Sequence, residues 1–93
     1  AQQEAMARLF WFTVEFGLIE ERGALRIYGS GLISSVGDAA NALGSRCDRR
    51  PFDLDAVLAQ PFAIDRLQDV LFVLTSFDQL YEAVATVRRR WRI

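Results

Sequence analysis

The sequence predicts an α+β fold that is rich in helix and carries one or two short hairpins. Apolar residues recur at helical spacing near both ends of the chain. Two short extended runs flank a glycine-containing turn between residues 17 and 30, and the apolar run from Val70 to Leu74 has the length of a strand. With 93 residues, of which 52% are apolar and 25% charged, the chain fits a single domain, residues 1–93.

The first predicted helix runs from Gln2 to about Phe16. One face carries the apolar residues Ala5, Met6, Leu9, Phe12 and Phe16, and Phe10, Trp11 and Val14 fill much of the remaining circumference. A helix that is apolar nearly all round is a buried one. Because so short a chain cannot wrap this helix completely, we expect either self-association through an uncovered face at Leu9, Phe12 and Phe16, or a covering partner that the chain lacks.

The middle of the chain predicts a hairpin and a second helix. Gly17 ends the first helix, and Arg22-Gly23 turns the hairpin. The next helix is expected from about Leu32 to Leu43, with Gly44 at its end. The polar stretch from Ser45 to Pro51 is predicted to be a loop.

The last third predicts two helices around one strand. Asp53 is expected to cap a short helix that stops before Pro61. The strand is residues 70–74. The final helix begins at Ser76 or Asp78, and one of its faces carries Phe77, Leu80, Tyr81, Val84 and Val87.

Composition excludes several classes of function. All eleven basic residues are Arg, and the chain has no His, which removes the commonest general base and a common iron or zinc ligand. The lone Cys47 cannot form an internal disulfide, which predicts a cytoplasmic protein. A net charge of −1 and the absence of a long apolar run or signal peptide argue against nucleic acid or a membrane as partner. The Arg-rich end at residues 88–92 is typical of a helix C-terminus.

Glu15 is the residue that departs from its surroundings, because it lies within the aromatic run LFWFTVEFGLI. An ionised carboxylate that is buried without a partner costs several kcal/mol, so such a group is usually paired, protonated or bound to a metal. One interpretation places Glu15 on a solvated strip at the helix end. The other makes it a metal ligand or base in an apolar pocket, and periodicity alone leaves both open.

Two motifs resemble a known family. RLFWFTVEFGLIE (8–20) and LRIYGSGLISSVGD (25–38) are similar to the C-terminal part of the catalytic fold of the aromatic amino acid hydroxylases. The likeness is greatest to the bacterial, single-domain members that act on phenylalanine, and it continues more weakly through residues 51–84. The resemblance therefore covers almost the whole chain.

The resemblance implies a mononuclear iron site with two His and one Glu, in which Glu15 is the carboxylate ligand. It also implies Fe(II) and tetrahydropterin as cofactors, and hydroxylation of phenylalanine to tyrosine with dioxygen. Neither His is present in this sequence. We therefore expect a C-terminal fragment of a larger catalytic domain, inactive by itself.

The resemblance assigns further roles position by position. Trp11, Ser34 and Gly31 would contact the aromatic amino acid substrate, and Ala7 would lie near the pterin. Phe16 and Asp38 would surround the metal ligand. Departures from the family pattern occur at Phe10, where Tyr is common, at Asp38, where Glu is usual, and at Asp69 and Leu71, where Pro and Tyr are common.

Two alternatives remain open from the sequence. The chain could be a remnant domain that kept the fold, lost the chemistry and acts as a dimerising or interaction module. A parent enzyme could also prefer tryptophan or tyrosine over phenylalanine, because much of the specificity pocket would lie outside these residues.

Overall fold

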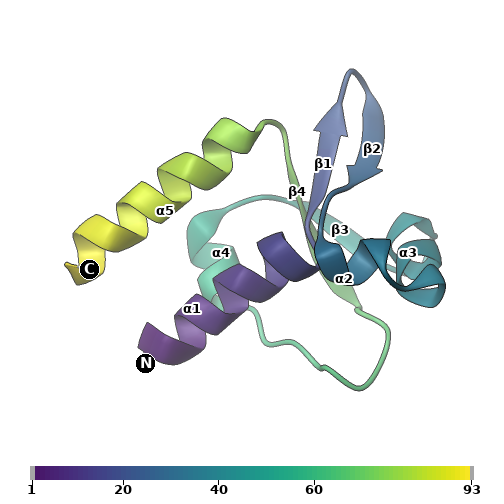
Figure 1. Cartoon of the computed structure of the whole chain (residues 1–93), viewed down its shortest axis with the longest axis horizontal. Coiled ribbons are helices and arrows are strands. Elements are labelled where there is room, and N and C mark those ends of the chain that lie inside the picture. Colours follow the sequence, from purple (N-terminus) through teal and green to yellow (C-terminus); the bar gives the residue numbers. More distant parts are fainter. Residues whose placement is uncertain (1, 93) are drawn as a thin grey trace.

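The computed structural model describes residues 2–92, and its centre is a mixed four-stranded sheet (Figure 1). The strands are β1 (Leu18–Glu21), β2 (Ala24–Ile27), β3 (Asp48–Pro51) and β4 (Val70–Leu74). They are ordered β2-β1-β4-β3 across the sheet. β1 pairs antiparallel with β2, while β4 pairs parallel with both β1 and β3. The α+β fold class predicted from the sequence is confirmed.

The remaining elements are helices. They are α1 (Gln2–Phe10), the π-helix η1 (Trp11–Glu15), α2 (Ser30–Ile33), α3 (Val36–Leu43), α4 (Leu54–Ala59) and α5 (Phe77–Trp91). α1 packs beside α4, α2 lies against η1 and α3, and α5 extends away from the end of β4 (Figure 1). Every helix within residues 2–92 falls short of the length and apolar character that a bilayer crossing requires.

The first helix differs from the prediction in two ways. Its α-helical part ends at Phe10, and one turn of π-helix follows, so that a wider turn and not a regular helix carries Glu15. The face at Leu9, Phe12 and Phe16 is buried inside the chain, which contradicts the prediction that this face is uncovered. The large apolar side chains that remain exposed on this segment are Met6, Phe10 and Val14.

The hairpin is confirmed, with Arg22 and Gly23 as its two-residue turn. Both residues have positive φ, +52° and +78°, and Glu21 pairs with Ala24 across the turn. This is the backbone conformation that two-residue hairpin turns favour. Leu18 and Ile19 enter the core, while the tip of the hairpin projects from the body of the molecule (Figure 1).

The predicted loop from residue 45 to 51 is wrong over its second half, which forms β3. All four residues of β3 are exposed, so the strand carries no alternation of polar and apolar residues. Its stability comes from parallel pairing with β4, from Asp48 opposite Val70 to Pro51 opposite Val73. Cys47, expected in a polar loop, is buried beneath this edge.

The predicted helix from 32 to 43 is divided at Ser34 and Ser35. Ser35 has extended backbone angles, and its Oγ accepts a hydrogen bond from the backbone N–H of Asp38, which makes it the N-cap of α3. The predicted cap at Asp53 is confirmed by its side-chain bond to the N–H of Ala56.

The last helix buries a narrower face than the periodicity predicts. Ala83 and Val87 are buried, whereas Phe77, Tyr81 and Val84 are exposed. The main core lies between the sheet and the first helical segment, and its largest fully buried side chains include Phe12, Leu18, Leu32, Leu71 and Phe72.

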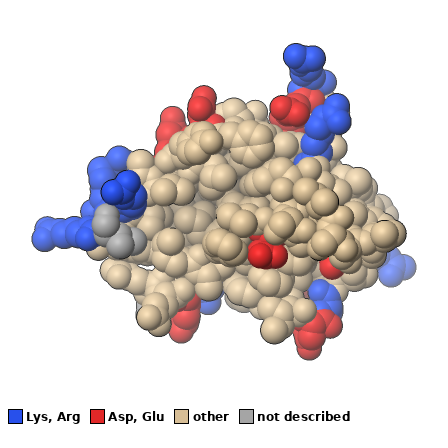
Figure 2. Space-filling model, viewed as in Figure 1, with Lys and Arg blue, Asp and Glu red and all other residues tan. Residues whose placement is uncertain are grey.

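Most of the charged side chains visible in Figure 2 stand at the edges of the face that it shows. Basic residues gather at the end of α5, on the left of the view, while uncharged residues cover most of the middle. Arg90 in this group pairs with Asp55 of α4, with 2.7 Å between Nη1 and Oδ1. The side-chain hydrogen bond from Arg90 lowers the pKa of the Asp55 carboxyl.

Candidate metal and substrate site

A π-helical turn places Glu15. The backbone N–H of Phe16 donates to the carbonyl oxygen of Trp11 at 2.9 Å, five residues back. The buried Thr13 hydroxyl donates to the carbonyl oxygen of Leu9 at 2.6 Å and so occupies an acceptor of the preceding turn. π-helical turns are rare in proteins and occur frequently at functional sites. This geometry favours the interpretation of Glu15 as a functional carboxylate.

The Glu15 carboxylate is half-buried and has no partner. Among residues 2–92 it makes no hydrogen bond or ion pair. The same residues contain no cluster of three or more His, Cys, Asp or Glu side chains that could hold a metal ion. The chain therefore offers one anionic oxygen donor at this position and not a complete metal site.

A glycine-rich turn, Tyr28–Gly31, lies directly behind this carboxylate. The carbonyl oxygen of Gly17 accepts from the backbone N–H groups of both Tyr28 and Gly29 at 3.1 Å. A Cβ atom on Gly29 would lie 2.4 Å from the Glu15 carbonyl oxygen, and one on Gly31 would lie 3.2 Å from Glu15 Oε2. Glycine is required at position 29 because the two backbone segments touch.

Tyr28 packs into the space that Gly17 leaves free. A Cβ atom on Gly17 would lie 2.1 Å from the Tyr28 ring and 2.3 Å from the carbonyl oxygen of Thr13. The Tyr28 ring meets Phe77 edge to face, with 5.1 Å between the ring centroids. Its hydroxyl is buried and has no hydrogen-bond partner among residues 2–92, and burial raises the pKa of Tyr28 well above its ordinary value.

Trp11 begins the π-helical turn and lies within an aromatic cluster. Its ring stacks on Phe62, with 4.5 Å between centroids and 11° between planes. It also contacts Phe16 at 4.5 Å with a tilt of 36°. The predicted substrate-side residue Trp11 and the predicted neighbour Phe16 are thus brought together beside Glu15.

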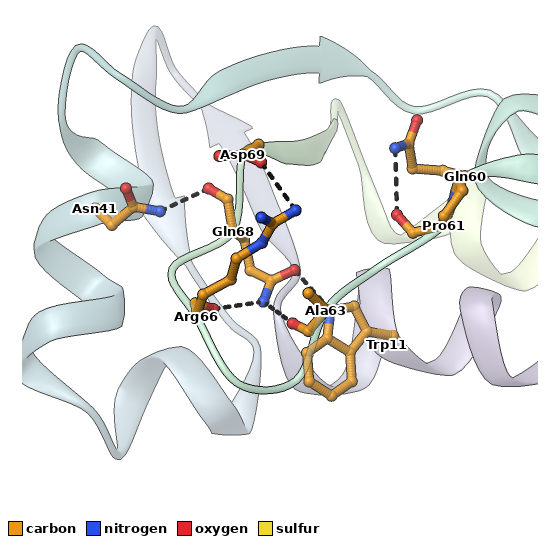
Figure 3. Close-up of polar contacts among 8 residues, drawn as sticks. All are labelled: Trp11, Asn41, Gln60, Pro61, Ala63, Arg66, Gln68 and Asp69. Atoms are coloured by element: carbon orange, nitrogen blue, oxygen red, sulfur yellow. Dashed lines mark hydrogen bonds and ion pairs between the residues drawn. The ribbon is translucent and has the colours of Figure 1, made fainter.

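Gln68 holds the Trp11 ring at its N–H edge (Figure 3). Its Oε1 accepts from the indole Nε1–H at 3.1 Å. Sequence reasoning missed both Gln68 and Phe62, which belong to the irregular segment between α4 and β4. The signals were a polar residue two positions before an apolar strand and a single aromatic residue after Pro61.

The other predicted site residues lie at different distances from this centre. Ser34 is exposed at the end of α2, where its Oγ donates to the carbonyl oxygen of Gly31 at 3.3 Å and so supports the turn behind Glu15. Asp38 is half-buried in the first turn of α3, and its carboxylate bonds to no described residue. Ala7 is exposed on α1 and lines a shallow pocket with Phe62.

Comparison with known proteins identifies the family. The model of the biopterin-dependent aromatic amino acid hydroxylases matches residues 1–92. The chain belongs to this family. It is 45% identical over 82 residues to the phenylalanine-4-hydroxylase of Vibrio cholerae, covering 87% of this chain. It is 35% identical over 88 residues to the tyrosine 3-monooxygenase of Drosophila melanogaster, covering 95% of this chain.

Solved hydroxylase structures share the fold. Chromobacterium violaceum phenylalanine hydroxylase with bound Fe(III) matches with a TM-score of 0.88 and 39% identity, covering 95% of this chain and 32% of that one. The same enzyme with iron(III) and 7,8-dihydrobiopterin matches with a TM-score of 0.83 and 38% identity, covering 95% and 33%. The chain spans only 28% of the Vibrio hydroxylase and 14% of the Drosophila one.

Proposed function

We propose that this chain is the C-terminal part of an iron- and tetrahydropterin-dependent monooxygenase that converts phenylalanine to tyrosine with dioxygen, and that Glu15 is its carboxylate iron ligand. The observation that carries the proposal is the unpartnered Glu15 carboxylate at the end of a π-helical turn, backed by glycines. Iron in the related Chromobacterium structures and the biopterin dependence of the family support it.

The donor set fits one of the three protein ligands of such a site. A carboxylate with two His in a facial arrangement is typical of non-haem Fe(II) oxygenases, and Glu15 supplies the carboxylate. The sequence contains no His, so the two nitrogen ligands would come from other parts of the natural protein. By itself this chain is proposed to be inactive. When bound, the iron and the reduced pterin supply the dioxygen chemistry.

The residues of this chain would bind and orient the substrate. The stacked pair of Trp11 and Phe62, with Phe16 against Trp11, offers a flat apolar wall for an aromatic ring. Such a wall excludes water from the reacting ring. Gly31 and Ser34, on the turn behind Glu15, are proposed to contact the amino acid part of the substrate, and Ala7 the pterin.

The chemistry of the wall favours phenylalanine over tyrosine. Its aromatic residues carry no hydroxyl, and the one amide oxygen beside them, on Gln68, already accepts from Trp11. Because Gln68 is buried, a phenolic hydroxyl has little access to a hydrogen-bond partner on this wall, and a polar group buried without a partner is costly. The higher identity to the bacterial phenylalanine hydroxylase agrees with this choice.

The alternative, a non-catalytic interaction module, has less support. The face expected to mediate dimerisation, at Leu9, Phe12 and Phe16, is already buried within the chain. Self-association through other apolar side chains of the first helix stays a prediction, as does a cytoplasmic location. Sedimentation at several protein concentrations would test self-association.

The test is an assay of the natural protein that contains this chain, supplied with Fe(II), tetrahydropterin and dioxygen. Phenylalanine, tyrosine and tryptophan are offered separately, and hydroxylated products are separated by chromatography. We expect tyrosine from phenylalanine at a catalytic efficiency at least about tenfold above that for the other two. Absence of product from all three would contradict the proposal. The 93-residue chain alone, as a control, is expected to give none.

A further inference from the structure

Gln68 is one of the two polar side chains in residues 2–92 that are buried, with 6% of its surface exposed. It lies just before β4 and bonds to three separate parts of the chain (Figure 3). Its Oε1 accepts from the Trp11 indole at 3.1 Å, and its Nε2 donates to the carbonyl oxygens of Ala63 at 2.6 Å and Arg66 at 3.2 Å. Its own carbonyl oxygen accepts from Asn41 Nδ2 of α3 at 2.8 Å.

These partners define a single orientation of the amide. The indole N–H can only donate, and the two carbonyl oxygens can only accept. Turning the amide over would place the NH₂ group against the indole N–H and the oxygen against two carbonyl oxygens. Both hydrogens of the NH₂ group are used, so the side chain is fully satisfied in one arrangement only.

The same contacts fix the Trp11 ring. The indole has one hydrogen-bond donor, and Gln68 takes it, while Phe62 and Phe16 pack on the ring. Trp11 is also the first residue of η1, and its carbonyl oxygen accepts from the N–H of Phe16, next to Glu15. Gln68 thereby joins the segment from residue 60 to 69 to the turn that carries the carboxylate.

We propose that Gln68 is a positioning residue: its amide holds the Trp11 ring at the orientation in which the aromatic wall receives the substrate ring. This inference rests on the proposed function. Gln68 does not touch the substrate, and its effect is transmitted through Trp11. A misplacement of the wall would weaken binding of the aromatic amino acid.

The test compares Gln68→Leu with Gln60→Leu in the natural protein that contains this chain. Gln60 is a matched control, because it begins the same segment and its amide bonds to a single described group, the adjacent Pro61 carbonyl oxygen, at 3.2 Å. For Gln68→Leu we expect about a tenfold higher KM for phenylalanine with a small change in kcat, because the Trp11 indole loses its acceptor and the segment loses the two bonds that Nε2 donates. Calorimetry without pterin or dioxygen is expected to show the same rise in the Kd for phenylalanine. Gln60→Leu is expected to change neither.

A second readout is independent of activity. In protein labelled with ¹⁵N-tryptophan, the NMR signal of the Trp11 indole N–H is identified as the one that disappears in Trp11→Phe. Its exchange with solvent is expected to be at least about tenfold faster in Gln68→Leu and unchanged in Gln60→Leu. If Gln68→Leu does not fold, Gln68→Met replaces it, because the Met side chain keeps the length of Gln while its thioether is only a weak hydrogen-bond acceptor, and the same rise in KM and Kd is expected.

The outcomes separate this inference from the proposed function. A purely structural role would lower the melting temperature and the yield of folded protein but leave KM and Kd of the folded fraction unchanged. That result, with an active wild-type enzyme, overturns the role of Gln68 alone. A wild-type protein that neither binds nor hydroxylates an aromatic amino acid overturns the proposed function, and the role of Gln68 with it.

Discussion

Gly31 lies against the carboxylate of Glu15: a Cβ atom at position 31 would stand 3.2 Å from Oε2 and 3.0 Å from the Glu15 carbonyl oxygen. The two residues come from different elements, Glu15 from the end of η1 and Gly31 from α2. Their contact means that the turn from Tyr28 to Gly31 forms the back wall for the carboxylate. The two family motifs in the sequence are therefore one structural unit.

Alanine substitutions at Gly29 and Gly31 are expected to have different effects. At Gly29 the new methyl group would lie 2.4 Å from two backbone atoms, which cannot move independently, so we expect a loss of about 3 kcal/mol in unfolding free energy. At Gly31 the methyl group would lie farther from its neighbours, 3.0 Å from the Glu15 carbonyl oxygen and 3.2 Å from Oε2, so the loss is expected to stay below about 1.5 kcal/mol. Urea denaturation of the natural protein measures both.

The Gly31 variant is expected to bind iron about tenfold more weakly, because the carboxylate must shift to admit the methyl group. Iron affinity in Gly31→Ala equal to that of the wild type would show that this wall does not position Glu15. Gly37→Ala is the control, since a Cβ atom at that position would meet nothing within 4 Å.

Removal of the Tyr28 hydroxyl is expected to stabilise the protein. The hydroxyl is buried and meets no partner in the described part of the chain, so Tyr28→Phe is expected to raise the unfolding free energy by about 1 kcal/mol at neutral pH. Exposed Tyr81 provides the matched variant Tyr81→Phe, which removes no buried hydroxyl and is expected to change little. A destabilised Tyr28→Phe protein would mean that this hydroxyl has a partner in the natural protein.

We expect the titration of Tyr28 to lower the stability of the protein at alkaline pH. Burial raises the pKa of Tyr28 in the folded state. Below the ordinary tyrosine pKa of 10.0 the hydroxyl is protonated in both the folded and the unfolded chain, so its titration takes nothing from stability there. Above that pH the unfolded chain loses the proton while the folded chain keeps it, and stability falls as pH rises. Unfolding curves between pH 8 and about 11 are expected to show a smaller fall for Tyr28→Phe than for the wild type.

Alanine substitutions at the adjacent residues Ser34 and Ser35 are expected to have opposite effects: the first lowers activity and the second lowers stability. Ser34 is exposed, and within residues 2–92 its hydroxyl bonds only to the nearby Gly31 carbonyl oxygen, so Ser34→Ala is expected to cost less than about 0.5 kcal/mol. We expect it to lower kcat/KM for phenylalanine about tenfold, because the hydroxyl supports the turn behind Glu15. Ser35→Ala removes the N-cap of α3 and is expected to cost about 1 kcal/mol while kcat/KM is retained. The opposite pattern would contradict the role proposed for Ser34.

The features that the sequence predicted well are local ones. Arg22-Gly23 between two extended runs, Asp53 before a short helix and the apolar run of β4 each depend on residues close in the chain. β3 could not be found in this way, because an exposed strand without alternation owes its existence to pairing with β4, about twenty residues later.

The site was predictable in part. The contrast between Glu15 and its apolar neighbours drew attention to the right residue, and the resemblance suggested its role. A periodicity of 3.6 residues could not show that the helix widens into a π-turn at Trp11. Gln68 and Phe62 were missed because they lie in an irregular segment more than fifty residues from Trp11, where only the folded chain shows their contacts.

The most direct test of the central claim, that Glu15 is an iron ligand, is an anaerobic titration of Fe(II) into the metal-free natural protein that contains this chain. The wild type is compared with Glu15→Gln and with Glu20→Gln, a control at an exposed carboxylate on β1. We expect one tight iron site in the wild type and in Glu20→Gln, and an iron affinity more than about a hundredfold weaker in Glu15→Gln, with an unchanged melting temperature. Equal iron affinity in Glu15→Gln and the wild type would contradict the claim.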